Sequence, residues 1–117
     1  MNVIASPLVA IDNEPDPILM VDAPLAGPLV SGKVFIQYRA THMRIMPVFG
    51  AGAMSVSPRL GHIHVTVDDS HWHFIDGSGE AIVIVGLSPG EHRVRIDLAN
   101  PIHQTVATCT IEFTVPD

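Results

Sequence analysis

Residues 61–68, Gly-His-Ile-His-Val-Thr-Val-Asp, alternate between apolar and polar side chains. Ile63 and Val65 point to one side of an extended chain, whereas His62 and His64 point to the other. The segment is therefore predicted to form a half-buried β-strand whose second face carries two imidazoles. Side chains two residues apart on one strand face lie roughly 6.5–7 Å apart, so both rings can lean towards one ion. A His-x-His strand is thus a candidate two-ligand metal site.

Short alternating or apolar segments recur along the chain, separated by Gly, Pro, Asp and Asn. No segment shows a sustained helical period. About seven short strands divided by turn residues are typical of an antiparallel β-sandwich, which is the predicted fold. Besides residues 62–68, the expected strands are 18–22, 33–40, 71–75, 80–85, 91–98 and 107–115.

The first 30 residues hold five of the ten prolines. Proline removes a backbone donor and fixes φ, so residues 1–17 are predicted to form a proline-rich N-terminal arm. Residues 18–117 are predicted to form a single β-sandwich domain, a size that one hydrophobic core can serve. The N-terminus lacks a basic region and is interrupted by Pro7, so it is not expected to be a signal peptide.

The formal net charge of −6 argues against binding to nucleic acid or to an anionic membrane surface, and it favours cations. No apolar run approaches the roughly 20 residues that a membrane-spanning helix needs. Because 47% of the residues are hydrophobic, excess apolar surface is expected to be buried in a homodimer. Residues 80–85 are apolar on both strand faces, which predicts cover on both sides, by the fold or by a partner chain. Cys109 shares a face with Ile111 and Phe113, so it is predicted to be a small core residue.

Four motifs together resemble an uncharacterised bacterial family that is classed only as a domain of unknown function. They are residues 35–39 (Phe-Ile-Gln-Tyr-Arg), 44–50 (Arg-Ile-Met-Pro-Val-Phe-Gly), 61–69 (Gly-His-Ile-His-Val-Thr-Val-Asp-Asp) and 86–92 (Gly-Leu-Ser-Pro-Gly-Glu-His). The Gly-His-x-His strand is also similar to other bacterial immunoglobulin-like domains. The resemblance implies an immunoglobulin-like β-sandwich and a periplasmic or secreted setting, and it implies no activity.

A third ligand is needed for more than weak metal binding. In an immunoglobulin-like order, strand 91–98 pairs with strand 62–68, so His103, which follows the Asn-Pro break after that strand, is expected near His62 and His64. The predicted metal ligands are therefore His62, His64 and His103, with His71, His73 and Asp69 as additional candidates. The alternative is a solvated or hydrogen-bonded histidine pair and an ordinary loop histidine. Imidazole ligands without thiolate suit a Cu or Zn ion.

The remaining histidines have structural explanations beside functional ones. His92 shares a face with apolar residues, which predicts a buried histidine bonded to the backbone. His71 and His73 flank Trp72, so these three rings can instead line a site for a small ligand. Asp68 directly follows the histidine strand, where it can orient an imidazole or simply form the turn.

Three functional hypotheses follow, and no catalytic residue is assigned in any of them. The first is a metal-binding β-sandwich for binding or sequestration, with copper favoured if Met43 or Met46 lies near the histidines. Binding should then weaken as the pH falls through roughly 6.5. The second is an enzyme, either a zinc-dependent hydrolase or a cupin-like site for Fe²⁺ or Mn²⁺; the cupin-like set is His62, His64, Asp69 and His92. The third is a structural or interaction domain without metal.

Overall fold

The computed structural model describes residues 14–71 and 73–117, so most of the predicted arm lies outside the described residues. The described chain forms nine strands and two short helices. The strands are β1 (Ile18–Val21), β2 (Lys33–Ile36), β3 (Tyr38–Thr41), β4 (Arg44–Ile45), β5 (Leu60–Val67), β6 (His73–Asp76), β7 (Ile82–Val85), β8 (Gly90–Ala99) and β9 (Thr105–Val115). The helices are α1 (Ala26–Leu29) and the 3₁₀ helix η1 (Ala51–Ser55). The structure is mostly β, as predicted, with more strands than expected. The prediction of antiparallel pairing alone is wrong, because β4 pairs with β5 in parallel.

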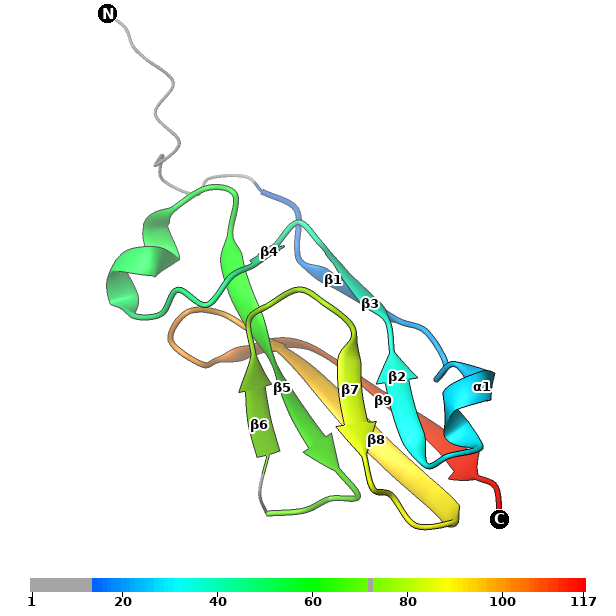
Figure 1. The fold of residues 1–117 in the computed structure, drawn as a ribbon. Helices are drawn as coiled ribbons and strands as arrows, with labels where there is room; N and C mark the ends of the chain where they lie inside the picture. The colour runs from blue at the N-terminus through cyan, green and yellow to red at the C-terminus, as the bar shows by residue number, and fades with distance from the viewer. Residues whose placement is uncertain (1–13, 72) are drawn as a thin grey trace, which may run out of the picture.

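The largest sheet has five strands and is centred on β5 (Figure 1). β8 pairs with one edge of β5 in antiparallel register, and β9 continues the sheet beyond β8. The other edge of β5 is shared by β4, which runs parallel to it, and by β6, which runs antiparallel. The predicted pairing of the histidine strand with strand 91–98 is confirmed, because Ile63 lies opposite Leu98.

Two small antiparallel sheets complete the fold, β1 with β3 and β2 with β7. They arise because the chain changes its pairing partner at Gln37, between β2 and β3. The carbonyl of Gln37 accepts a hydrogen bond from the Asp22 backbone N–H at 2.9 Å. The prediction of one continuous strand over 33–40 is therefore wrong at this residue. Alternation indicates which face a side chain takes, but it does not indicate which strand pairs with which.

The hydrophobic core combines side chains from β5 and β8 of the large sheet with others from β2 and β7. Its fully buried aliphatic residues are Val34, Ile36, Ile63, Val65, Ile82, Val94, Ile96 and Leu98. On β7, Val83 and Val85 are 51% and 67% exposed. The prediction that the fold itself covers both faces of this strand is therefore wrong. Cover of these residues by a partner chain stays a prediction. Cys109 is half-buried rather than part of the inner core.

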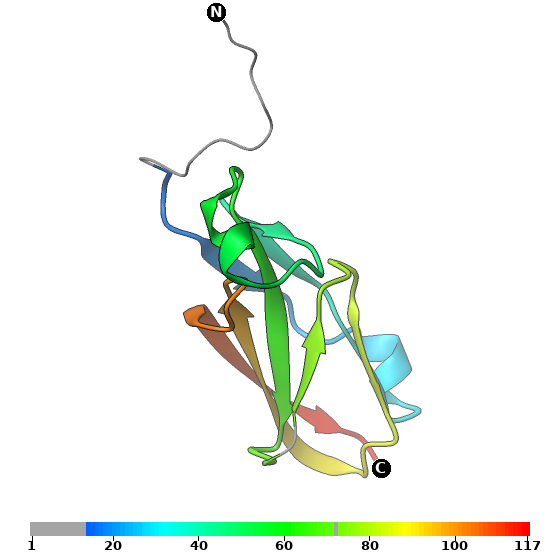
Figure 2. The ribbon, with the colours of Figure 1, turned by 90° about the vertical axis from the view of Figure 1, so that its left-hand side faces the viewer.

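One end of the molecule gathers two loops beside β5. The loop between β8 and β9 lies next to the segment that precedes η1, and both views show it there (Figures 1 and 2). The backbone N–H of Gly50 donates a hydrogen bond to the carbonyl of Pro101 at 2.9 Å, which joins the two loops. No helix within residues 14–71 and 73–117 has the length and apolar character to cross a bilayer.

Candidate metal centre

The two histidines of the His-x-His motif lie on the face of β5 that is turned away from the core. Their positions follow from strand alternation, because Ile63 and Val65 occupy the core face. His62 lies opposite Ala99 on β8, and His64 lies opposite Asp97. His62 is nevertheless fully buried and His64 half-buried, since the loops at this end of the sheet cover them. The alternative of a solvated pair is therefore wrong for His62, while His64 stays partly accessible.

A loop built around Asn100 brings the third histidine to the pair. The Asn100 side-chain oxygen accepts hydrogen bonds from the backbone N–H groups of Ile102 at 3.1 Å and Gln104 at 3.0 Å. The Asn100 carbonyl accepts a further bond from the N–H of His103 at 2.9 Å. His103 takes a left-handed conformation with φ of 65° at the tip of this turn. The 8% exposed Asn100 is therefore the residue that orders the loop.

The ring nitrogens of the three histidines converge on one point. His62 Nε2 lies 2.9 Å from His64 Nε2 and 3.1 Å from His103 Nδ1. All three ligand atoms lie within 4.8 Å of one another. Nitrogens bound to one tetrahedral zinc at about 2.0–2.1 Å lie roughly 3.3 Å apart, so small shifts of the rings would accommodate an ion. Among the described residues, this is the one group of at least three histidine, cysteine or acidic side chains with such spacing.

Burial keeps two of these imidazoles in the neutral form. Desolvation, followed by the neighbouring His64 and His103, lowers the pKa of His62 from 6.5 to about 4. Desolvation, followed by His73 and His103, also lowers the pKa of His64, against a raising effect from Asp97. A neutral imidazole is the form that binds a metal ion. As ligands, these two imidazoles would compete with protons less than an ordinary histidine does, so binding would be lost below the pH expected from the sequence.

Within the described ranges, His62 lacks the hydrogen bonds to backbone or carboxylate groups that an ordinary structural histidine makes. Its Nδ1 is buried and has no hydrogen-bond partner in the described part of the chain, and its Nε2 contacts other histidines only. An ion at Nε2 would leave this Nδ1 without a partner, at a cost of about 1–3 kcal/mol, so the orphaned nitrogen is not itself a sign of a metal. The half-buried His92, by contrast, bonds through both of its ring nitrogens. What favours a metal-binding arrangement of His62 is the convergence of its Nε2 with nitrogens of two other imidazoles.

Phe49 forms an apolar wall beside the cluster, and sequence reasoning missed it. Its ring stacks on His103 with centroids 5.5 Å apart and meets His62 edge-on at 4.9 Å. The hydrogen bond of Gly50 to Pro101 holds this wall against the His103 loop. Nothing in the spacing of Phe49 relative to the histidines indicates the contact, because it depends on how two loops distant in sequence pack.

The additional candidate ligands have different positions. The ring of His73, on β6, stacks on His64 with centroids 5.4 Å apart and an interplanar angle of 20°. His71 is exposed in the turn before β6. Asp69 lies beyond the far end of β5 and pairs with Arg93, so the structure does not bring it to the cluster. The predicted aromatic wall at Trp72 lies outside the described residues.

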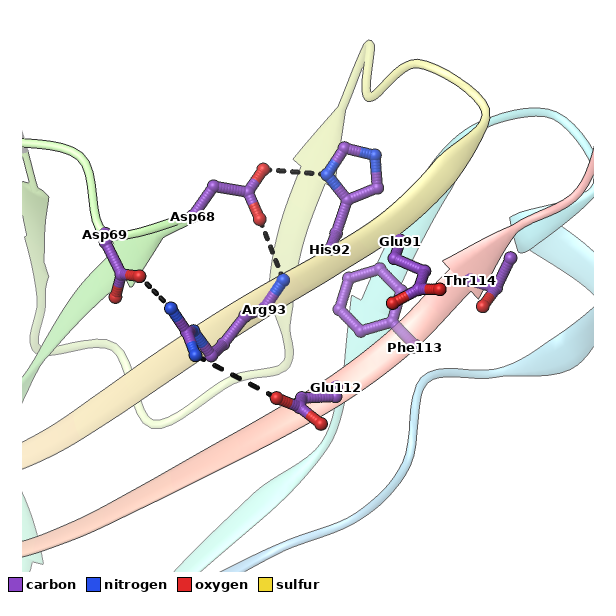
Figure 3. A pocket seen from close by; sticks show the side chains of 8 residues that line it. All are labelled: Asp68, Asp69, Glu91, His92, Arg93, Glu112, Phe113 and Thr114. Atoms are coloured by element: carbon purple, nitrogen blue, oxygen red, sulfur yellow. Dashed lines mark hydrogen bonds and ion pairs between the residues drawn. The ribbon is translucent and has the colours of Figure 1, made fainter.

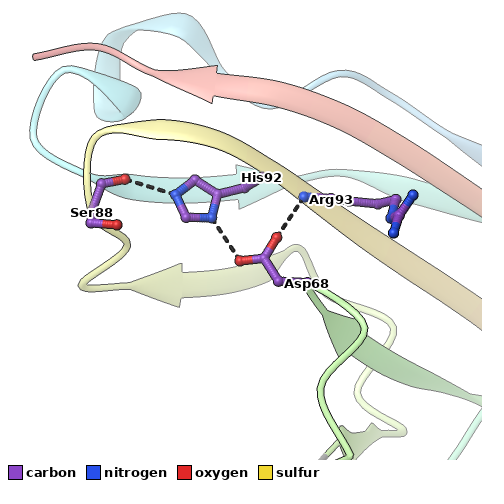
Figure 4. Close-up of polar contacts among 4 residues, drawn as sticks. All are labelled: Asp68, Ser88, His92 and Arg93. Atoms are coloured by element: carbon purple, nitrogen blue, oxygen red, sulfur yellow. Dashed lines mark hydrogen bonds and ion pairs between the residues drawn. The ribbon is translucent and has the colours of Figure 1, made fainter.

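Asp68 and His92 form a separate contact at that far end of β5 (Figure 4). His92 Nδ1 lies 2.7 Å from the Asp68 carboxylate, and its Nε2 lies 2.7 Å from the Ser88 carbonyl oxygen. The Asp68 hydrogen bond, followed by the one to Ser88, raises the pKa of His92. The predicted bond of His92 to the backbone is confirmed, although the ring is only half-buried. The cupin-like set is wrong, because Asp69 and His92 lie at the opposite end of the strand from His62.

The surface around this contact is a pocket of about 520 Å³ in which charges of both signs pair with one another (Figure 3). Arg93 contacts Asp69 and lies 3.9 Å from Glu112. The pocket is lined by Asp68, Asp69, Glu91, His92, Arg93, Glu112, Phe113 and Thr114. These residues form exposed ion pairs and a turn with one another, so the pocket does not indicate a function of its own.

The sulfur of Met43 lies on the core side of β5, away from the histidine cluster. Met43 is 6% exposed and belongs to the core, with its sulfur against Gly61 on the side where a Cβ would project. Gly61 has the strand parity of Ile63, so this side is the core face of β5 and the histidines occupy the other. The condition that would have favoured copper is therefore not met for Met43.

Comparison with known proteins gives a family and no activity. Neither the curated proteins nor the solved structures provide a match to the chain. The model of a family of unknown function, DUF6130, matches residues 3–117. Because this match covers nearly the whole sequence, the chain belongs to the DUF6130 family of unknown function.

Proposed function

We propose that this protein binds one Zn²⁺ or Cu²⁺ ion through Nε2 of His62, Nε2 of His64 and Nδ1 of His103, in a binding or sequestration role. The observation that carries the proposal is the convergence of three imidazole nitrogens within 4.8 Å in a partly enclosed site. Three imidazoles without a thiolate or thioether suit these two ions. The net charge of −6 favours the approach of a cation.

A metal titration of apo protein without a histidine tag tests the proposal. Wild type is expected to bind one ion, and His64→Ala is expected to lose more than about 100-fold in affinity, since loss of an outer-shell partner alone costs about 10–100-fold. His103→Asn provides a second variant at an exposed position, where asparagine tolerates the left-handed backbone conformation. His42→Asn is the matched control, because His42 is an exposed histidine outside the cluster in a left-handed conformation that asparagine tolerates.

The same titration contains the outcomes that would refute a metal site. Absence of binding by wild type, or equal affinity of wild type and His64→Ala, would refute the proposed site. A bound ion should also raise the free energy of unfolding by about 2.7 kcal/mol at a concentration of 100 times Kd. If chelator leaves the stability of metal-loaded protein unchanged, the ion has no preference for the folded state, which would also refute the site.

A zinc-dependent hydrolase is the second candidate function. Three protein ligands leave a fourth coordination position, and catalytic zinc sites use that position to activate water. The exposed His103 places this position within reach of solvent. Hydrolysis of an activated ester by the zinc-loaded wild type, but not by His64→Ala, would favour this candidate over sequestration. Chelator should abolish the wild-type activity, and added zinc should restore it.

Two further proposals concern the assembly. We infer that residues 18–117 form one immunoglobulin-like β-sandwich, supported by a single core to which the large sheet and the β2–β7 sheet both contribute. We also propose a homodimer through β7, supported by the exposed Val83 and Val85 on one face of that strand. Analytical ultracentrifugation of wild type and Val85→Lys tests the dimer, because a charge at this position should favour the monomer.

A further inference from the structure

A fourth histidine lies beside the proposed metal centre on the same outer face of the sheet. His73, the first residue of β6, lies opposite Thr66 of β5, one alternate position along the strand from His64. Its ring stacks on that of His64, with centroids 5.4 Å apart and an interplanar angle of 20°. His73 is exposed, His64 is half-buried and His62 is fully buried. The three rings therefore form a row that leads from the surface to the inner site.

The spacing of these three rings suits an ion between each pair of neighbouring rings. The His62 and His64 centroids are 4.9 Å apart, similar to the 5.4 Å between His64 and His73. Two imidazoles bound to one tetrahedral ion have centroids roughly 5 Å apart, given metal–nitrogen distances of about 2.0–2.1 Å. His64 is thus placed to share an ion with His73 on its outer side or with His62 and His103 on its inner side.

His73 is not arranged as a permanent fourth ligand. An ion bound in the plane of one ring lies outside the plane of a nearly parallel neighbour, so His73 must turn before it can share an ion with His64. Its exposed side chain leaves it free to turn. Its nitrogens also lie outside the group of ligand atoms within 4.8 Å that the other three histidines form.

We propose that His73 is the capture ligand of the metal centre: an incoming Zn²⁺ or Cu²⁺ ion binds first between His73 and His64 and then moves inward. This inference rests on the proposed metal-binding function. The ion keeps its bond to His64 Nε2 throughout, and the His64 ring turns inward with it. Its bond to His73 breaks as bonds to His62 Nε2 and His103 Nδ1 form, and water molecules leave the ion. No electron is transferred, and the ion keeps its charge.

The electrostatic surroundings of the row support the approach of a cation. Asp97 lies opposite His64 on β8, with its side chain 15% exposed. Its carboxylate accepts a hydrogen bond from the Thr108 hydroxyl at 2.7 Å and lies 3.3 Å from Arg95 Nε. These partners hold a carboxylate beside the middle of the row, where it offsets the charge of an ion that has lost part of its water.

Stopped-flow transfer of Zn²⁺ from a chromophoric chelator tests the proposal, with wild type, His73→Val and His71→Val. Valine retains the strand propensity of position 73. A ligand used only on the way in and out changes the rates of loading and release equally, so His73→Val is expected to slow both by roughly tenfold at unchanged Kd. His71→Val, an exposed histidine in the adjacent turn, should match wild type. The Co²⁺ absorption spectrum should be the same in all three proteins.

Two outcomes would overturn the capture role while leaving the metal centre in place. One is that His73→Val loads and releases Zn²⁺ at the wild-type rates. The other is a weaker Kd together with an altered Co²⁺ spectrum, which would make His73 a fixed ligand. Failure of wild type to bind Zn²⁺ or Co²⁺ at equilibrium would instead overturn the metal centre, and the capture role with it.

Discussion

The buried imidazole of His62 should make the stability of the metal-free protein depend on pH. Its pKa falls from 6.5 in the unfolded chain to about 4 in the folded protein. Between these values the unfolded chain binds a proton that the folded protein does not, so stability decreases as the pH falls through this window. The slope from this group is about 1.36 kcal/mol per pH unit, and the full contribution at neutral pH is about 3 kcal/mol.

Urea denaturation between pH 4.5 and 7.5, with chelator present, measures this contribution in wild type and in His62→Leu. Leucine places an apolar side chain in this fully buried position and removes the titrating group. The other titrating groups remain in both proteins, so the difference between the two curves isolates His62. The wild-type curve should fall more steeply below pH 6.5, by about 1 kcal/mol per unit. Parallel curves would refute the argument that burial holds this ring neutral.

Three further changes test the surroundings of the cluster. Gly61→Ala should cost about 1–3 kcal/mol of unfolding free energy in thermal denaturation, because the new Cβ would lie 2.7 Å from a backbone carbonyl oxygen. Gly52→Ala is the control and should be near neutral, because open space surrounds Gly52. Asn100→Ala should weaken Zn²⁺ binding by about 10–100-fold through loss of the loop's internal hydrogen bonds, which calorimetry can measure. Phe49→Ala should admit water and raise the pKa of His62 towards 6.5, as followed by NMR titration; an unchanged pKa would show that Phe49 does not desolvate the ring.

Much of the histidine site could be predicted from strand geometry. Alternation along β5 placed His62 and His64 on one face, and the expected pairing with strand 91–98 placed His103 near them. The supporting residues could not be found in this way. Phe49 meets the cluster through a contact between loops about 50 residues apart, and Asn100 was expected to interrupt a strand rather than to order a loop.

For the fold, too, the sequence predicted which strand faces point to the core but not how all of the strands pair. Strand parity identified Ile63 and Val65 as core residues, as the structure has them. The break at Gln37 was missed because both halves of the segment alternate in phase, and only the choice of partner strand separates them. The exposure of Val85 was missed because apolar composition on two faces does not say whether the second face is covered within the same chain.

The contact between Asp68 and His92 gives β5 ends that respond to protons in opposite directions. The pKa of His92 is raised, so its contribution is present below 6.5 and is lost as the pH rises through the raised value. The contribution of His62 is lost as the pH falls from 6.5. Mild acidification is therefore expected to favour the contact after β5 and to disfavour the end that carries the candidate metal centre. An ion bound there would be released at a pH at which the contact at the other end of the strand still holds.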